Sequence, residues 1–218
     1  MKRVFGIFAH PDDETFGPGG TLALLAKEHD VYIICATNGD GVQGSRKKEV
    51  ALGKLRKKEL LASAKILGIK KVFFLGYRDG SLSHNIYHEL SEKVLDIVKK
   101  LKPQTIITFE PRGVSGHIDH IVMSMVCSFI FPKVTSVTKL MKYCLPTEYA
   151  KVLGKDYFIH FPSGYSKDEI DEVVKTTSVW DQKVLAMHKH VSQMRDVNRI
   201  LSRHKNFPKE ENFLVIEK

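Results

Sequence analysis

The residues of this chain whose types and spacing could do chemistry begin near its amino terminus. The apolar run Val4-Phe5-Gly6-Ile7-Phe8 leads directly into Ala9-His10-Pro11-Asp12-Asp13-Glu14. The side chains of His10 and Asp13 suit a divalent metal such as zinc, and Pro11 restricts the backbone between them. We expect Asp12 to point elsewhere, toward a water molecule on that metal.

Two further histidines, His117 and His120, lie where an apolar run ends and a helical pattern begins. Either or both imidazoles can join the site opened by the first motif. Two histidines and a carboxylate, with one position open for water, form a familiar catalytic zinc arrangement. Zinc lowers the pKa of its water to about 7, and Asp12 is the natural candidate for the base that takes the proton.

Each of these residues also has a simpler interpretation. A lone histidine is commonly an ordinary core or surface residue, and an acid after a strand commonly caps a helix or interacts with its dipole. Both clusters follow apolar runs of the kind that form buried strands. Their joint occurrence at such positions therefore favours a site over two unrelated structural details.

The elements that must position these residues alternate between strand and helix. We predict strands at 4–8, 31–36, 71–75 and 105–109, each followed by polar or glycine residues, with helices at 21–27, 45–67 and 84–101 between them. This order predicts an α/β fold, with a mostly parallel sheet flanked by helices. All four loops after the strands then meet at the carboxyl edge of the sheet, where such folds bind ligands.

The remainder of the chain has less regular patterns. We predict a buried helix at 121–131, strands at 134–145 and 157–161, helices at 166–175 and 180–203, and a last edge strand at 213–216. We detect no repeat, low-complexity tract or linker. The prediction is a single domain over residues 1–218.

The composition is that of a folded soluble protein. The formal net charge is +9, but the lysines and arginines of the chain are spread among helical segments. We therefore expect a solvated helix face or a partner surface, and no nucleic-acid ligand.

The three cysteines lie in apolar runs without metal spacing, which is typical of buried thiols in a reducing compartment. No apolar stretch reaches the ~18 residues of a membrane span. We therefore expect a cytoplasmic protein.

The two motifs together resemble a known family. Ala9-His10-Pro11-Asp12-Asp13-Glu14 resembles the signature of the PIG-L/LmbE-like zinc-dependent N-deacetylases, and Gly116-His117-Ile118-Asp119-His120 resembles their second motif. The similarity continues through landmarks that cover nearly the whole chain: Thr37-Asn38-Gly39-Asp40, Arg56, Glu59, Asp79-Gly80, Lys183, His190, Ser192 and Gln193.

The resemblance implies a Rossmann-like fold and hydrolysis of an acetamide on a glucosamine-type sugar. By motif, one zinc ion per chain would be bound by His10, Asp13 and His120, and Asp12 would be the general base. His117 would stabilise the oxyanion, and Asp119, hydrogen-bonded behind it, would hold its ring and favour its charged form. Asp12 or His117 would then protonate the departing amine.

Substrate-contacting positions of the family match Arg56 and Asp79. Asp79 could accept hydrogen bonds from ring hydroxyls, and Arg56 could pair with a phosphate or carboxylate on the aglycone; the alternatives are a solvated helix residue for Arg56 and a turn residue for Asp79. Two residues depart from the family pattern. Ile118 replaces a usual proline, and Ser115 replaces a tyrosine of some mycothiol-pathway members, which weakens assignment to that branch.

The expected partner is a small N-acetylglucosaminyl conjugate, and the positive net charge mildly favours an anionic aglycone. Other readings are a metal-dependent phosphoester hydrolase and an inactive sugar- or nucleotide-binding module. The phosphoester hydrolase is disfavoured because a two-metal site needs more carboxylates than these motifs supply. His190 either reaches the site or caps the helix that contains Trp180 and Met187. The sequence reveals no interface that decides between a monomer and a homo-oligomer.

Overall fold

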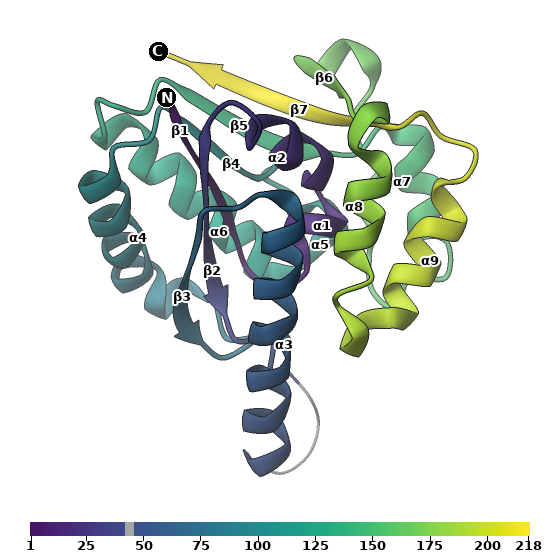
Figure 1. Cartoon of the computed structure of the whole chain (residues 1–218), viewed down its shortest axis with the longest axis horizontal. Coiled ribbons are helices and arrows are strands. Elements are labelled where there is room, and N and C mark those ends of the chain that lie inside the picture. Colours follow the sequence, from purple (N-terminus) through teal and green to yellow (C-terminus); the bar gives the residue numbers. More distant parts are fainter. Residues whose placement is uncertain (42–45) are drawn as a thin grey trace.

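Seven strands form one sheet at the centre of the molecule. The computed structural model describes residues 1–41 and 46–218. Strand order is β3-β2-β1-β4-β5-β7-β6 (Figure 1). The strands are β1 (Arg3–Phe8), β2 (Asp30–Thr37), β3 (Lys71–Tyr77), β4 (Thr105–Phe109), β5 (Lys139–Cys144), β6 (Glu172–Lys175) and β7 (Glu210–Glu217). This arrangement confirms the α/β prediction.

The first five strands are parallel, as the alternation of strands and helices predicts. β1 pairs with β2 and β4, β2 with β3, and β4 with β5, all in parallel register. β1 is buried throughout after Arg3 because its near-continuous apolar sequence is covered on both faces. The loops that follow these strands consequently meet at one edge of the sheet.

Helices cover both faces of this sheet. They are α1 (Asp13–Phe16), α2 (Gly19–Leu25), α3 (Arg46–Leu67), α4 (Tyr87–Leu101), α5 (Gly113–Gly116), α6 (Ile118–Ile130), α7 (Thr147–Gly154), α8 (Trp180–Met187) and α9 (Met194–His204). In Figure 1, α2 and α3 lie in front of the sheet and α6 lies behind it. Helix α3 packs on α8, and α4 packs on α6. The expected helix start at Ser45 lies outside the described residues.

Helix α4 illustrates why these segments fold as they do. Leu90, Val94 and Val98 recur at helical spacing and are fully buried, so one face of α4 enters the core. The helix ends at Lys102, whose φ of 48° is left-handed, and Pro103 prevents continuation.

The basic helix α3 has two different faces. The lysines at 47, 48, 54 and 58 are exposed, which confirms the expected solvated face. On the opposite face Leu60 and Leu67 are fully buried, together with the polar Arg56, Glu59 and Ser63. The polar residues of that face belong to the site described below.

Three predictions for the last third of the chain are wrong. Residues 157–161 form no strand, because their aromatic side chains pack on one another and line a cavity. Residues 166–175 form no α-helix: a short 3-10 turn, Lys167–Glu169, precedes β6, which pairs antiparallel with β7. Strand β7 also pairs with β5, so it lies inside the sheet and is not the expected edge strand.

The expected helix at 180–203 is interrupted. It divides into α8 and α9 around a turn that contains His190. Cys35, Cys127 and Cys144 are free and buried, as their apolar surroundings predict. Over the described residues, no helix has the length and apolar character required to span a bilayer.

Candidate active site

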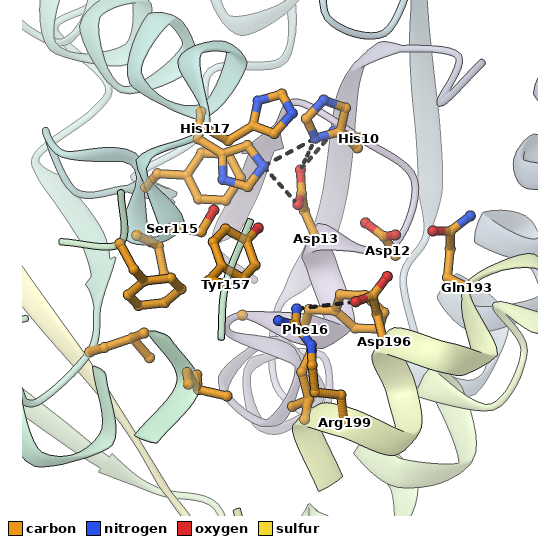
Figure 2. A pocket seen from close by; sticks show the side chains of 18 of the residues that line it. His10, Asp12, Asp13, Phe16, Ser115, His117, Tyr157, Gln193, Asp196 and Arg199 are labelled. Atoms are coloured by element: carbon orange, nitrogen blue, oxygen red, sulfur yellow. Dashed lines mark hydrogen bonds and ion pairs between the residues drawn. The ribbon is translucent and has the colours of Figure 1, made fainter. Parts of the chain in front are cut away.

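The loops at the carboxyl edge of the sheet border a cavity of about 650 Å³. Both sequence motifs reach it: His10, Asp12 and Asp13 follow β1, while His117 and His120 follow β4. Figure 2 shows His10, His117 and Asp13 grouped at one side of this cavity, with Tyr157, Asp196 and Arg199 around another. The convergence expected from parallel strand ends is therefore present.

Strained backbone marks both catalytic loops. Asp12 has a φ of 128° and Val114 a φ of 63°, and both residues line the cavity. Such conformations are costly for residues other than glycine and persist only where neighbouring interactions fix them. At Asp12 the carbonyl accepts the Thr15 hydroxyl at 2.9 Å, and the backbone N–H donates to Glu14 Oε2 at 3.0 Å. The loop is therefore held in place from two sides.

Hydrogen bonds define which ring nitrogens of two histidines carry lone pairs. His120 Nδ1 lies 3.1 Å from the Gly113 carbonyl, so it is the donor and Nε2 is left unprotonated. His10 Nε2 lies 3.1 Å from both Asp79 Oδ1 and Asp119 Oδ2, so it donates and leaves Nδ1 with the lone pair. Both free lone pairs face Asp13.

These lone-pair atoms converge closely. His10 Nδ1 is 3.1 Å from His120 Nε2 and 3.5 Å from Asp13 Oδ2, while His120 Nε2 is 3.2 Å from Asp13 Oδ1. Ligands held about 2.0–2.1 Å from a tetrahedral ion lie about 3.3–3.4 Å apart. The spacing and the donor types therefore fit a divalent cation.

His10 also belongs to two other groups of residues whose metal-ligating atoms lie close together. One combines it with His117 and His120, and the other with Asp79 and Asp119. Burial acts to lower the pKa of His10, but hydrogen bonds to Asp119, Asp13 and Asp79 outweigh it and raise that pKa well above the usual value. The carboxylates that favour a proton here would equally favour a metal cation.

Asp119 occupies a different place from the one expected. Its carboxylate accepts from His10 Nε2 and from the backbone N–H groups of Gly80 and Leu82, at 2.8 and 3.1 Å for the latter two. Within the described residues it makes no side-chain hydrogen bond to His117. The expectation that it holds the ring of His117 is wrong, because the start of α6 turns the carboxylate toward His10.

His117 is consequently a neutral imidazole in this arrangement. Burial, followed by electrostatic repulsion from the neighbouring His10 and His120 rings whenever they carry a proton, lowers the pKa of His117 to about 4. Its Nδ1 accepts the Asp119 backbone N–H at 3.2 Å, as an N-cap of α6. The remaining hydrogen therefore lies on Nε2, where it is available to a group in the cavity.

Arg56 of α3 pairs with Asp12. The two Nη atoms donate to Asp12 Oδ2 at 2.8 Å, to Asp79 Oδ2 at 3.4 Å, and to the carbonyls of Pro11 and Gly39 at 2.7 and 2.9 Å. A solvated Arg56 is therefore excluded. The expected pairing with an anionic aglycone is not what the structure supports either, since these contacts occupy all four Nη hydrogens.

Asp12 titrates differently from its neighbours. Burial is the largest cause that raises the pKa of Asp12 to about 7; Arg56 lowers it, and the negative charge of Asp13 raises it again. Burial also acts to raise the pKa of Asp79, but hydrogen bonding to His10 and the charges of His10 and Arg56 lower it to about 2. Asp12 thus has the pKa of a base that works near neutral pH.

A buried polar layer behind the first motif was not recognised in the sequence. Glu14 Oε1 accepts from Ser63 Oγ at 2.5 Å and contacts His190 Nε2 at 2.7 Å. His190 is fully buried and does not line the cavity, so it does not reach the site. It does not cap α8 either, because that helix is capped by His188. Glu59 similarly binds the backbone N–H and hydroxyl of Ser192. The turn between α8 and α9 therefore supports the catalytic loop.

The glycine-rich segment after the first motif is anchored from the other end of the chain. Glu211 of β7 accepts the backbone N–H groups of Gly20 and Thr21 at 2.8 and 2.7 Å. Lys183 donates to Glu211 and to the Gly17 carbonyl. A Cβ at Gly20 would lie 2.6 Å from Thr176, so only glycine permits this approach.

The second half of the cavity was also missed. It is lined by aromatic and charged residues, among them Phe16, Tyr157, Phe158, Arg195 and Arg199. In the sequence, the clustering of Tyr157, Phe158 and Phe161 fits an aromatic wall of a binding site and a β-strand equally well. Only the structure, which places these residues in the cavity lining, distinguishes the two.

Comparison with known proteins places these motifs in one family. The profile described as PIG-L, GlcNAc-PI de-N-acetylase, matches residues 5–130, which is more than half of the chain and includes both motifs. The chain belongs to the PIG-L family. The family membership expected from the two motifs is therefore confirmed.

Similar PIG-L proteins are named as deacetylases of sugar conjugates. A 1D-myo-inositol 2-acetamido-2-deoxy-alpha-D-glucopyranoside deacetylase of Mycolicibacterium smegmatis is 28% identical over 88% of this chain and 80% of the relative. A probable N-acetyl-alpha-D-glucosaminyl L-malate deacetylase 2 of Bacillus cereus is 30% identical over 88% of this chain and 84% of the relative.

The fold is also similar to that of a solved deacetylase structure. The N,N'-diacetylchitobiose deacetylase from Pyrococcus horikoshii superposes with a TM-score of 0.74 at 22% identity, covering 99% of this chain and 84% of that one. At this identity the likeness concerns the fold. The likeness includes the irregular last third of the chain.

Proposed function

We propose that this PIG-L protein hydrolyses the N-acetyl group of an N-acetylglucosaminyl conjugate, releasing acetate and a free amine. We further propose that His10, Asp13 and His120 hold one zinc ion, that Asp12 is the base, and that the protein acts as a single domain in the cytoplasm. Named relatives that act on glucosaminyl conjugates support the substrate class. The observation that carries the proposal is the convergence of lone-pair atoms from His10, Asp13 and His120 in the cavity that Asp12 also lines.

The chemistry of the donor set favours a cation. The lone pairs of His10, Asp13 and His120 that face one another repel unless a proton or a metal ion lies between them. Two imidazoles and one carboxylate are the ligands that zinc prefers in catalytic sites. When bound, the ion would supply Lewis acidity, which polarises an amide carbonyl and makes a water molecule easier to deprotonate.

The residues of the chain perform the remaining tasks. Asp12 accepts a proton from water as the water oxygen bonds to the amide carbon. Arg56 holds the carboxylate of Asp12 in place. His117 donates its Nε2 hydrogen to the carbonyl oxygen, where negative charge develops. The carbon–nitrogen bond then breaks, and the proton on Asp12 passes to the departing nitrogen.

Asp79 and Asp119 act on His10. Their carboxylates fix the His10 ring so that Nδ1 faces Asp13, which is the support that metal-binding histidines usually receive. Asp79 also borders the cavity, and a carboxylate oxygen has lone pairs enough to accept a sugar hydroxyl beside its contacts with His10 and Arg56. We retain Asp79 as a substrate-binding residue, whereas we assign Arg56 to the positioning of Asp12.

The test of this proposal is a panel of N-acetylglucosaminyl compounds assayed for acetate and free amine. We expect at least one compound to yield both in equal amounts, and we expect a strong chelator to abolish the reaction. Phosphate release from phosphoester substrates, without acetate release from any of the sugars, would support the phosphoester hydrolase instead. Tight sugar binding without turnover would support the inactive binding module.

A further inference from the structure

We propose that the second half of the cavity is an aglycone subsite for an uncharged ring with an apolar face, such as a second sugar or an aryl group. The subsite comprises Tyr157, Phe158, Phe161, Ile200, Arg195 and Arg199. This inference rests on the proposed deacetylase function, because it places the acetamide at the metal-ligating residues. The subsite would determine which N-acetylglucosaminyl conjugate is the substrate. The two sequence motifs do not determine this.

The cavity is divided into two chemically different halves. Near the strand ends its lining is charged and imidazole-rich, whereas near α7 and α9 it combines aromatic and aliphatic side chains with two arginines and two aspartates. Figure 2 shows this division, with Tyr157 and Phe16 between the histidines and Arg199. A cavity of about 650 Å³ has the size of sites that hold a drug-sized ligand. It therefore has room for a group beyond the acetylated sugar.

The aromatic wall is built from one short segment after α7. The rings of Tyr157 and Phe158 lie 4.7 Å apart, and those of Tyr157 and Phe161 meet edge to face at 5.1 Å. Phe158 is 78% exposed even though it lines the cavity. A ring stacked on Phe158 would remove this aromatic surface from water, which is favourable.

Contacts with the catalytic loop fix the distance between this wall and the acetamide site. The backbone of His160 lies against Gly116, where a Cβ would approach the His160 carbonyl to 2.7 Å. Arg112 donates to the Gly164 carbonyl at 2.8 Å, and the Tyr165 hydroxyl donates to Glu110 at 2.6 Å. The aromatic segment and the loop that carries His117 therefore form one connected wall.

The charges of this half cancel. Arg199 pairs with Asp196 at 3.1 Å and lies over the Tyr157 ring at 5.0 Å. Arg195 has no ion-pair partner among residues 1–41 and 46–218, and Asp156 supplies a second negative charge in the same lining. Two arginines and two aspartates give no net formal charge. A small dicarboxylate would therefore find less electrostatic attraction here than the net charge of the whole chain suggests.

The test compares kcat/KM for free N-acetylglucosamine, its p-nitrophenyl glycoside, diacetylchitobiose and the malate conjugate. We expect the two ring-bearing conjugates to be preferred over both the free sugar and the malate conjugate. Phe158→Ala should lower the ratio of kcat/KM for the p-nitrophenyl glycoside to that for the free sugar by at least about fivefold, the loss typical of removing one stacking ring. Ile159→Ala, an adjacent exposed residue outside the cavity lining, should leave that ratio unchanged.

Two results would overturn the subsite. One is preference for the malate conjugate over both ring-bearing compounds, and the other is an unchanged ratio in both Phe158→Ala and Tyr157→Ala. If no compound is deacetylated, the proposed function fails, yet titration of wild type and Phe158→Ala with the p-nitrophenyl glycoside still measures the subsite. Weaker binding by Phe158→Ala supports it in that case, and equal or absent binding overturns it.

Discussion

Replacing Asp12 with asparagine is expected to lower kcat for deacetylation by about 10²–10⁴-fold, the usual contribution of a general base, while metal content stays unchanged. The amide keeps the size of the carboxylate but cannot accept the proton from water. Metal retention is expected because none of the lone-pair atoms that converge on Asp13 belongs to Asp12. Metal analysis and steady-state kinetics on the same preparation check both parts.

Asp13→Asn is the matched comparison, because the neighbouring aspartate undergoes the same chemical change. We expect this variant to lose both metal and turnover, since it removes the negative charge that faces His10 and His120. The split between two adjacent aspartates is the sharpest consequence of the proposed roles. Metal loss in Asp12→Asn, or turnover within tenfold of wild type, would contradict the role of Asp12.

The second large effect concerns stability. His190→Ala is expected to lower the free energy of unfolding by about 3 kcal/mol, because it leaves the buried Glu14 without its ionic partner. For a chain of this length such a loss corresponds to a Tm about 6–12 °C lower. Denaturant unfolding of both proteins measures the difference. His188→Ala is the control, since His188 is exposed and should change stability by less than about 0.5 kcal/mol.

The stabilisation from His190 should also depend on pH. Burial acts to lower the pKa of His190, but the charge and hydrogen bond of Glu14 outweigh it and raise that pKa. A histidine whose pKa is raised on folding contributes fully below its unfolded pKa of about 6.5 and loses the contribution as pH rises through the folded pKa. The difference between wild type and His190→Ala should therefore shrink at alkaline pH. A difference that grows with pH would contradict a charged His190.

The periodic part of the fold could be predicted from sequence because each element there satisfies one simple pattern. Apolar runs such as Val4–Phe8 followed by polar loops imply parallel strands whose carboxyl ends meet. That reasoning brought His10 and His120 to one site across 110 residues of sequence. The last third follows no such pattern, since residues 157–161 and 166–175 take their conformation from tertiary contacts.

Within the site, the types of residue were predictable but several of their partners were not. Arg56, Glu59 and Ser63 share one buried face of α3, at spacings of three and four residues. Polar residues at these core positions were a signal that the helix contacts a polar loop. Asp119 had no comparable signal: which histidine it contacts depends on the direction of the carboxylate at the start of α6.

The central claim is that a metal held beside Asp12 enables amide hydrolysis, and metal removal with add-back tests it most directly. The purified protein is stripped with a chelator, and acetate release from an N-acetylglucosaminyl conjugate is measured before and after zinc is returned. We predict no release from the stripped protein and recovery at about one zinc ion per chain. Undiminished acetate release from protein shown to be metal-free would contradict the account.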